Sequence, residues 1–185
     1  MTKPNLDYKP WEEYPHLWKT ESAFWTYIRG ALRQALWMRS PIKLSYKSSV
    51  CTAPPKDYTG RGKKGTFCAL TGVWVATSKA EIDHIEGNVS LTCWEDVLPF
   101  IQHLVPEKGT LQYVDKEAHK IKSYSEKQNI TFEEATIQKK AIEILKDSKK
   151  CLTWFKERGI IPPSNAKLRR EAIIKYLEEN KDETI

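Results

Sequence analysis

The sequence has few cysteines, and none of them is paired at a short spacing. The 185 residues include four cysteines, Cys51, Cys68, Cys93 and Cys151. A CxxC pair usually marks a structural zinc site or a dithiol redox site, and the chain has no such pair. We therefore expect free thiols, as in a reducing compartment, and no structural zinc.

Long apolar runs are also missing. No stretch approaches the roughly 20 apolar residues that span a bilayer, and Met1–Asp7 is polar, unlike a signal peptide. A G-x-S-x-G nucleophile motif, a P-loop and a dinucleotide fingerprint are absent too. We therefore expect a soluble cytoplasmic protein with no membrane partner, and the sequence does not support Ser-His-Asp catalysis or a nucleotide cofactor.

Charge and aromatic content indicate a folded protein with a polyanionic partner. Hydrophobic residues make up 40% of the chain, with seven tryptophans and eight tyrosines to fill a core. Residues 1–79 carry 13 Lys and Arg against 5 Asp and Glu, a net charge of +8, whereas residues 80–185 have a net charge of −2. A positive half suits phosphate contacts. An ordinary solvated basic surface would explain the same charge.

Apolar spacing predicts an α+β fold in two parts. An arm over residues 1–19 should lie against the body, and residues 21–39 have the 3.6-residue apolar period of a helix that Pro41 ends. Further expected elements are a basic Gly-rich loop over 52–66, short strands over 66–72, 73–76, 79–86 and 110–114, and helices over 94–105 and 115–127. We assign these elements to one domain, residues 1–128.

Residues 129–185 form the second part, a helical C-terminal unit. Thr131 and Glu134 fit a capping box, a second helix should end at Gly159, and Pro162-Pro163 leads into a third helix. This third helix begins with Lys167, Arg169 and Arg170 and is suited to contact DNA. Packing, homodimerisation or contact with a protein partner would explain it equally well.

The residues with the clearest chemistry are Asp83-His84 and His119. Asp83 and His84 end a strand, where neighbouring side chains point to opposite faces, and His119 follows 35 residues later on a helix. Asp and His suit Mg²⁺, Mn²⁺, Ni²⁺ or Zn²⁺, and two protein ligands leave room for water and a phosphate oxygen. A histidine that is not a ligand can then act as general base, because the pKa of an imidazole lies near neutral pH. This hypothesis makes His84 the base and Asp83 and His119 the metal ligands; the alternative is that the histidines are structural, as we expect for His16 and His103.

Four segments resemble the HNH endonuclease superfamily, and most closely its small phage-encoded members. They are Phe67–Gly72, Ala80–Gly87, Leu111–Val114 and Ala118–Lys122, and the aromatic, Arg-containing Phe24–Arg33 and Ser90–Asp96 are also similar to phage HNH proteins. The resemblance covers roughly residues 16–125. It implies a ββα-metal finger with His84 as general base, Asp83 and His119 on one divalent ion, and products with 5′-phosphate and 3′-hydroxyl ends.

The chain departs from the family pattern in two places. Many relatives hold a zinc with two CxxC pairs. Here the first pair is reduced to Cys68 and Thr71, and the second pair is replaced by Asp115 and Ala118. The middle asparagine of the motif is replaced by Thr110, which can still hydrogen-bond, and Asn88 is a possible substitute.

The expectation is therefore a nuclease that cuts or nicks double-stranded DNA in the cytoplasm of a host cell, using one divalent metal ion such as Mg²⁺ or Mn²⁺. The alternatives are an inactive DNA-binding protein of the same fold, or a phage factor that binds another protein. The residues expected to contact nucleic acid are Arg29, Arg33, Arg61, Lys63, Lys64, Lys120 and Lys122.

Overall fold

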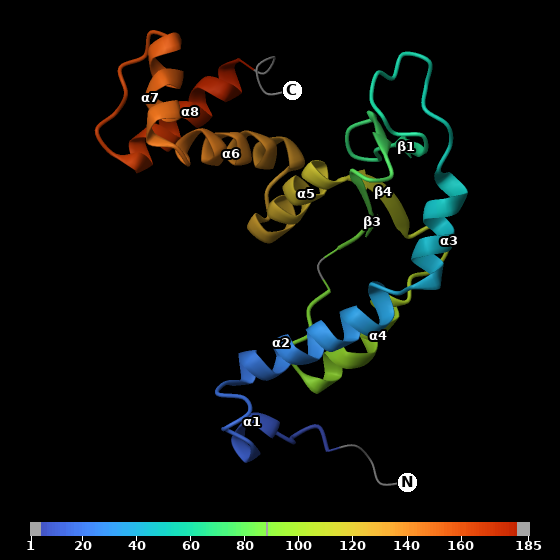
Figure 1. Ribbon diagram of the computed structural model, residues 1–185. Helices are drawn as coiled ribbons and strands as arrows, with labels where there is room; N and C mark the ends of the chain where they lie inside the picture. The colour runs from blue at the N-terminus through green and yellow to red at the C-terminus, as the bar shows by residue number, and fades with distance from the viewer. Residues whose placement is uncertain (1–4, 88, 181–185) are drawn as a thin grey trace. The chain divides into compact units, whose positions relative to one another are not determined.

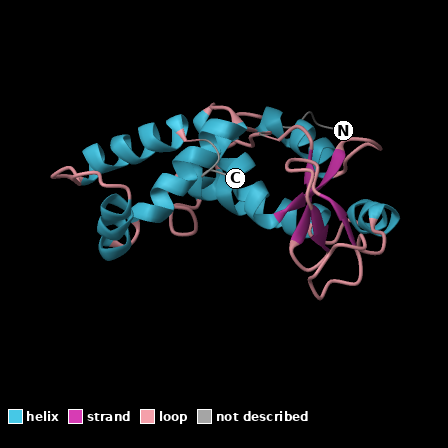
Figure 2. Ribbon diagram, turned by 90° about the horizontal axis from the view of Figure 1, so that it is seen from above, coloured by secondary structure: helices cyan, strands magenta, loops and turns pink. Residues whose placement is uncertain are grey.

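The computed structural model describes residues 5–87 and 89–180, which fold as an α+β protein. These residues form eight α-helices and two small antiparallel sheets of two strands each (Figure 1). The chain divides into two compact units, Met1–Lys116 and Glu117–Ile185. All strands of the described residues belong to the first unit, and Figure 2 distinguishes them from the helices by colour. The division falls between Lys116 and Glu117, and the predicted domain boundary after residue 128 stays a prediction.

The N-terminal arm packs on the body as expected. It contains the short helix α1, Pro10–Glu13, and Trp11 and Trp18 lie with ring centroids 5.6 and 5.2 Å from that of Phe24. Trp94 donates a hydrogen bond from Nε1 to the carbonyl oxygen of Tyr8 over 2.8 Å. These contacts close a core around the buried residues Phe24, Trp25, Leu91, Phe100 and Leu104.

The predicted helix over residues 21–39 is confirmed in place but is not regular throughout. Helix α2, Glu21–Leu32, begins at the cap Thr20, whose side chain accepts a hydrogen bond from the Ala23 N–H. It continues into a π-helical turn, Arg33–Trp37. Pro41 does not simply end this helix: it begins another, α3, Pro41–Val50, which the sequence analysis missed. Proline is well tolerated at the first helical position because that N–H has no partner within the helix.

The predicted short strands are confirmed as two antiparallel pairs. Strands β1, Gly65–Phe67, and β2, Trp74–Ala76, pair antiparallel around a turn in which Gly72 has a φ of 69°. Strands β3, Ala80–His84, and β4, Leu111–Asp115, pair antiparallel with Asp83 opposite Gln112 and His84 opposite Leu111. A 3₁₀ turn, Trp94–Asp96, and helix α4, Val97–Leu104, lie between β3 and β4 in the chain.

The second unit is helical, as expected. Helix α5, Lys116–Gln128, follows β4 directly, and α6, Phe132–Leu145, begins with the predicted capping box of Thr131 and Glu134. Helix α7, Ser148–Glu157, precedes Gly159, whose φ is 66°, and α8, Ala166–Glu179, closes the unit. The buried faces of α6, α7 and α8 share one core of Ile137, Ala141, Cys151, Phe155, Ile173 and Leu177. Across the part of the chain that the structure describes, no helix has the length and apolarity needed to cross a membrane.

Candidate active site

Strand β3 sends Asp83 and His84 to opposite faces, as the sequence predicts for neighbours on a strand. Ala80, Ile82 and His84 are buried, whereas Glu81 is exposed and Asp83 is half-buried. This alternation follows the period of two along a strand. His84 therefore points inward with an exposed fraction of only 8%, and Asp83 points to the more open face.

Gln112 holds the Asp83-His84 pair from the neighbouring strand. Its Nε2 atom donates hydrogen bonds to Asp83 Oδ2 over 3.1 Å and to the backbone carbonyl oxygen of His84 over 2.9 Å. The Gln112 side chain is buried, with an exposed fraction of 8%. A buried amide that makes two hydrogen bonds fixes the direction of the Asp83 carboxylate. Gln112 was not predicted to be a site residue, although its place opposite Asp83 follows from the strand register.

The His84 ring stacks with two other rings. The ring centroid of Trp37, from the π-helical turn, lies 4.3 Å from that of His84 with 26° between the planes. The ring centroid of His103, from α4, lies 3.8 Å away at 27°. His103 was predicted to be a structural histidine, and the structure places it directly against the predicted general base.

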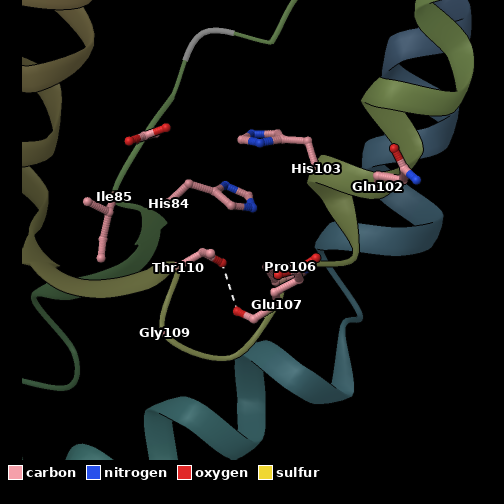
Figure 3. Close-up of a pocket in the computed structure, with 9 residues that line it drawn as sticks. His84, Ile85, Gln102, His103, Pro106, Glu107, Gly109 and Thr110 are labelled. Atoms are coloured by element: carbon pink, nitrogen blue, oxygen red, sulfur yellow. Dashed lines mark hydrogen bonds between the residues drawn. The ribbon is translucent and has the colours of Figure 1, made fainter.

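A pocket of about 440 Å³ opens beside these histidines. Figure 3 shows the rings of His84 and His103 one above the other on one side of it, and Thr110 and Glu107 on another. Thr110 donates a hydrogen bond from its hydroxyl to the Glu107 carbonyl oxygen over 2.8 Å, and its own carbonyl accepts one from the Ile85 N–H over 2.9 Å. Thr110 thus ties the loop before β4 to the end of β3, beside His84. Asn88, the possible substitute for the missing asparagine, lies outside the described residues.

His119 is the fourth residue of α5, in the second unit, and is half-buried. Asp83 belongs to the first unit and His119 to the second, and the structure describes each residue within its own unit. That the two residues bind one metal ion together therefore stays a prediction. Within residues 5–87 and 89–180, no three His, Cys, Asp or Glu side chains are grouped as metal ligands. The predicted site needs only two such ligands, with water and phosphate oxygens at the other positions.

The residues predicted to contact nucleic acid differ in their surroundings. Arg61, Lys63 and Lys64 are exposed on the loop before β1. Arg29 donates a hydrogen bond to Thr26 Oγ1 over 2.9 Å, and the Arg33 guanidinium lies 5.6 Å from the centroid of the Phe100 ring.

The two lysines of α5 that were predicted to contact phosphate form ion pairs along the helix. Lys120 Nζ lies 2.7 Å from Glu117 Oε1, and Lys122 Nζ lies 2.6 Å from Glu126 Oε1. The Lys122 side chain is only 11% exposed. The Lys120 side chain, in contrast, is 61% exposed.

Cys68, the remaining member of the first CxxC position, is buried and hydrogen-bonded. Its Sγ atom accepts a hydrogen bond from the Asp115 N–H over 3.3 Å. Burial on its own raises the pKa of the Cys68 thiol, but hydrogen bonds from the Thr71 side chain and from the backbone of Asp115, Leu70 and Thr71 lower that pKa overall. The sulfur therefore joins the start of the β1–β2 turn to the end of β4.

Comparisons with known proteins do not place this chain in a group. No family model matches the sequence, no curated protein is significantly similar to it, and no solved structure matches its fold.

Proposed function

We propose that this protein is a metal-dependent endonuclease of the HNH type that hydrolyses phosphodiester bonds in DNA. The observation that carries the proposal is the antiparallel pairing of β3 with β4, followed directly by α5, with Asp83-His84 ending β3 and His119 one turn into α5. Two paired strands and a following helix are what the resemblance to HNH nucleases implies; here α4 lies in the connection between the strands. The Gln112 hydrogen bond to Asp83 adds support, because it orients one predicted ligand.

In this proposal His84 is the general base. Its imidazole would accept a proton from a water molecule in the adjoining pocket, and that water would attack the phosphorus. A neutral imidazole accepts the proton through a nitrogen lone pair that lies in the plane of the ring. The pocket of about 440 Å³ has room for a phosphate group and its attacking water.

Asp83 and His119 would hold the divalent metal ion. The Asp83 carboxylate fits this role, because it is half-buried and oriented by an amide, as carboxylate ligands usually are. An oxygen and an imidazole nitrogen suit Mg²⁺ or Mn²⁺, and also Ni²⁺ or Zn²⁺. When bound, the ion would stabilise negative charge on the phosphate and on the leaving oxygen.

Double-stranded DNA is the proposed substrate. Arg61, Lys63 and Lys64 are exposed on a loop that contains Gly60 and Gly62, and basic side chains on such a loop can follow a phosphate backbone. The net charge of +6 favours a polyanion in general.

A second candidate function is DNA binding without catalysis. The observation that favours it is the burial of His84, whose Nε2 atom has almost no accessible surface. A histidine enclosed by aromatic rings is also a common core residue. This candidate keeps the basic loop as the DNA contact and gives His84 a structural role.

Incubation with supercoiled plasmid in Mg²⁺ or Mn²⁺, together with a DNA retention assay, separates these candidates. The nuclease predicts nicked or linear product with 5′-phosphate ends, and no product in EDTA. Salt-sensitive retention of DNA without any product would contradict the nuclease and favour the binding protein. His16→Ala is the matched control for histidine variants, because His16 lies in the N-terminal arm and is exposed.

A further inference from the structure

The π-helical turn after α2 brings an aromatic ring to the candidate base. Met38 donates its backbone N–H to the carbonyl oxygen of Arg33, five residues back, over 2.9 Å, where an α-helix would use the residue four back. The extra residue in the turn rotates the next residues of the chain by roughly 100° around the axis, the angle that one residue occupies in an α-helix. Trp37, the last residue of this turn, lies against His84.

Trp37 is itself held from a third element. The Lys43 ammonium, on α3, lies 4.6 Å from the centroid of the Trp37 ring, a cation–π distance. Burial lowers the pKa of Lys43, as expected for an ammonium group partly removed from water. The position of the indole is thus determined by the π-helical turn, by α3 and by β3 together.

His103 covers His84 from α4. The ring centroids of Trp37 and His103 lie 4.3 and 3.8 Å from that of His84, and both ring planes are within 27° of parallel to the imidazole. Two rings this close cannot both lie on one face of the small imidazole ring. They therefore cover opposite faces. Stacking on both faces restricts rotation of the ring about its side-chain torsions, while the nitrogen lone pairs remain in the ring plane.

We propose that Trp37 and His103 are positioning residues for His84, holding its imidazole plane so that a ring nitrogen is aimed at the attacking water. This inference rests on the proposed function, in which His84 is the base. It assigns no proton transfer to either stacking residue, because a fixed orientation is sufficient to account for an effect on rate. Misplacing a reacting group by about 1 Å can lower a rate by about 100-fold.

The test compares removal of each ring with its replacement by another ring. We expect Trp37→Ala and His103→Ala to lower kcat for plasmid nicking by about 10- to 100-fold with KM changed less than about threefold. Trp37→Phe and His103→Phe keep a planar ring and should restore kcat to within about threefold of the wild type. His16→Ala, which removes a histidine outside the stack, should leave kcat unchanged.

A second readout does not depend on activity. In the stack, the carbon-bound ring protons of His84 lie over neighbouring rings, so their NMR signals should be shifted upfield. Each alanine variant should move them downfield, each phenylalanine variant should keep most of the shift, and His16→Ala should leave them in place. The same spectra show whether each variant is folded.

Each outcome bears on a distinct claim. Folded alanine variants with wild-type kcat, or phenylalanine variants as slow as the alanine variants, would overturn the positioning role while leaving the nuclease intact. Unshifted His84 signals in the wild type would overturn the stack itself. A wild-type protein that does not cleave while His84 remains shifted would overturn the proposed function and, with it, the role of the two rings in catalysis, leaving the stack as a structural feature only.

Discussion

Gln112 and Asp83 face one another across the β3–β4 pair, and the amide Nε2 of Gln112 donates a hydrogen bond to Asp83 Oδ2 over 3.1 Å. The same nitrogen donates to the carbonyl oxygen of His84 over 2.9 Å. One buried amide thus connects the predicted metal ligand to the backbone of the predicted base.

Replacing Gln112 by leucine should weaken both the site and the fold. The variant removes two hydrogen bonds and leaves a half-buried carboxylate without its amide donor, so we expect a loss of about 1–3 kcal/mol in the free energy of unfolding. Loss of such an orienting group typically lowers metal affinity or activity by about 10- to 100-fold. Urea unfolding and nicking rates measure the two effects, with the exposed Gln128→Leu as control. A Gln112→Leu protein as stable and active as this control would contradict the role of the amide.

Tyr113→Phe tests how the two strand pairs are joined. The Tyr113 hydroxyl donates to the Val75 carbonyl oxygen over 3.0 Å, and the residue is only 2% exposed. The variant should lose about 1 kcal/mol of unfolding free energy, because it leaves a buried carbonyl without that donor. An unchanged urea midpoint at pH 7 would contradict this.

The same residue predicts an alkaline pH dependence. Burial, with a smaller contribution from Cys51, raises the pKa of Tyr113 from 10.0 to about 12. Between these two values the folded state retains a proton that the unfolded state releases, so stability should fall as the pH rises. Tyr113→Phe should show a shallower decline over the same range when unfolding is followed by tryptophan fluorescence.

Asp96 should contribute stability that is lost at low pH. Its Oδ2 accepts hydrogen bonds from the Thr92 backbone N–H, the Thr92 hydroxyl and the Cys93 N–H, at 2.7, 2.9 and 3.2 Å. Those from Thr92 are the main reason that the pKa of Asp96 lies below its usual 3.8. A depressed pKa means that this stabilisation is present above the pKa of the unfolded chain and is lost as the pH falls through the folded value. Thermal unfolding between pH 2 and 5 should therefore be less steeply pH-dependent in Asp96→Asn, and an equal slope in both proteins would argue against it.

Local sequence patterns predicted most elements of the fold, because apolar spacing and capping act over a few residues. The 21–39 helix, the strand that ends in Asp83-His84 and the capping box at Thr131 are examples. Helix α3 was missed because Pro41 was interpreted only as the end of a helix. Its cap is Ser40, whose side chain accepts a hydrogen bond from the Lys43 N–H.

The site was less predictable, because its contacts join residues far apart in the chain. The sequence identified Asp83-His84, yet the stacking of His103 on His84 depends on the direction in which α4 returns between the two strands. The π-helical turn that presents Trp37 has no clear local signal in its residues, Arg-Gln-Ala-Leu-Trp. Gln112 shows its role only once the β3–β4 register is known.

The basic loop should contribute to the salt dependence of DNA binding. We expect a triple variant in which Arg61, Lys63 and Lys64 are replaced by alanine to have a shallower slope of log affinity against log salt concentration. The slope should fall by about 0.9 for each DNA phosphate that the loop no longer contacts. A matched triple variant, Lys127, Lys146 and Lys175 to alanine, removes the same charge from exposed positions in the second unit. Equal slopes for the two triple variants would show that overall charge, and not the loop, accounts for the affinity.

The proposed role of His84 as general base of a metal-dependent nuclease is tested by the initial rate of plasmid nicking by His84→Ala in Mn²⁺. Removal of a general base should lower the rate by about 10²- to 10⁴-fold, while DNA retention stays close to that of the wild type and His16→Ala nicks at the wild-type rate. Nicking by a folded His84→Ala protein at the wild-type rate would contradict the assignment.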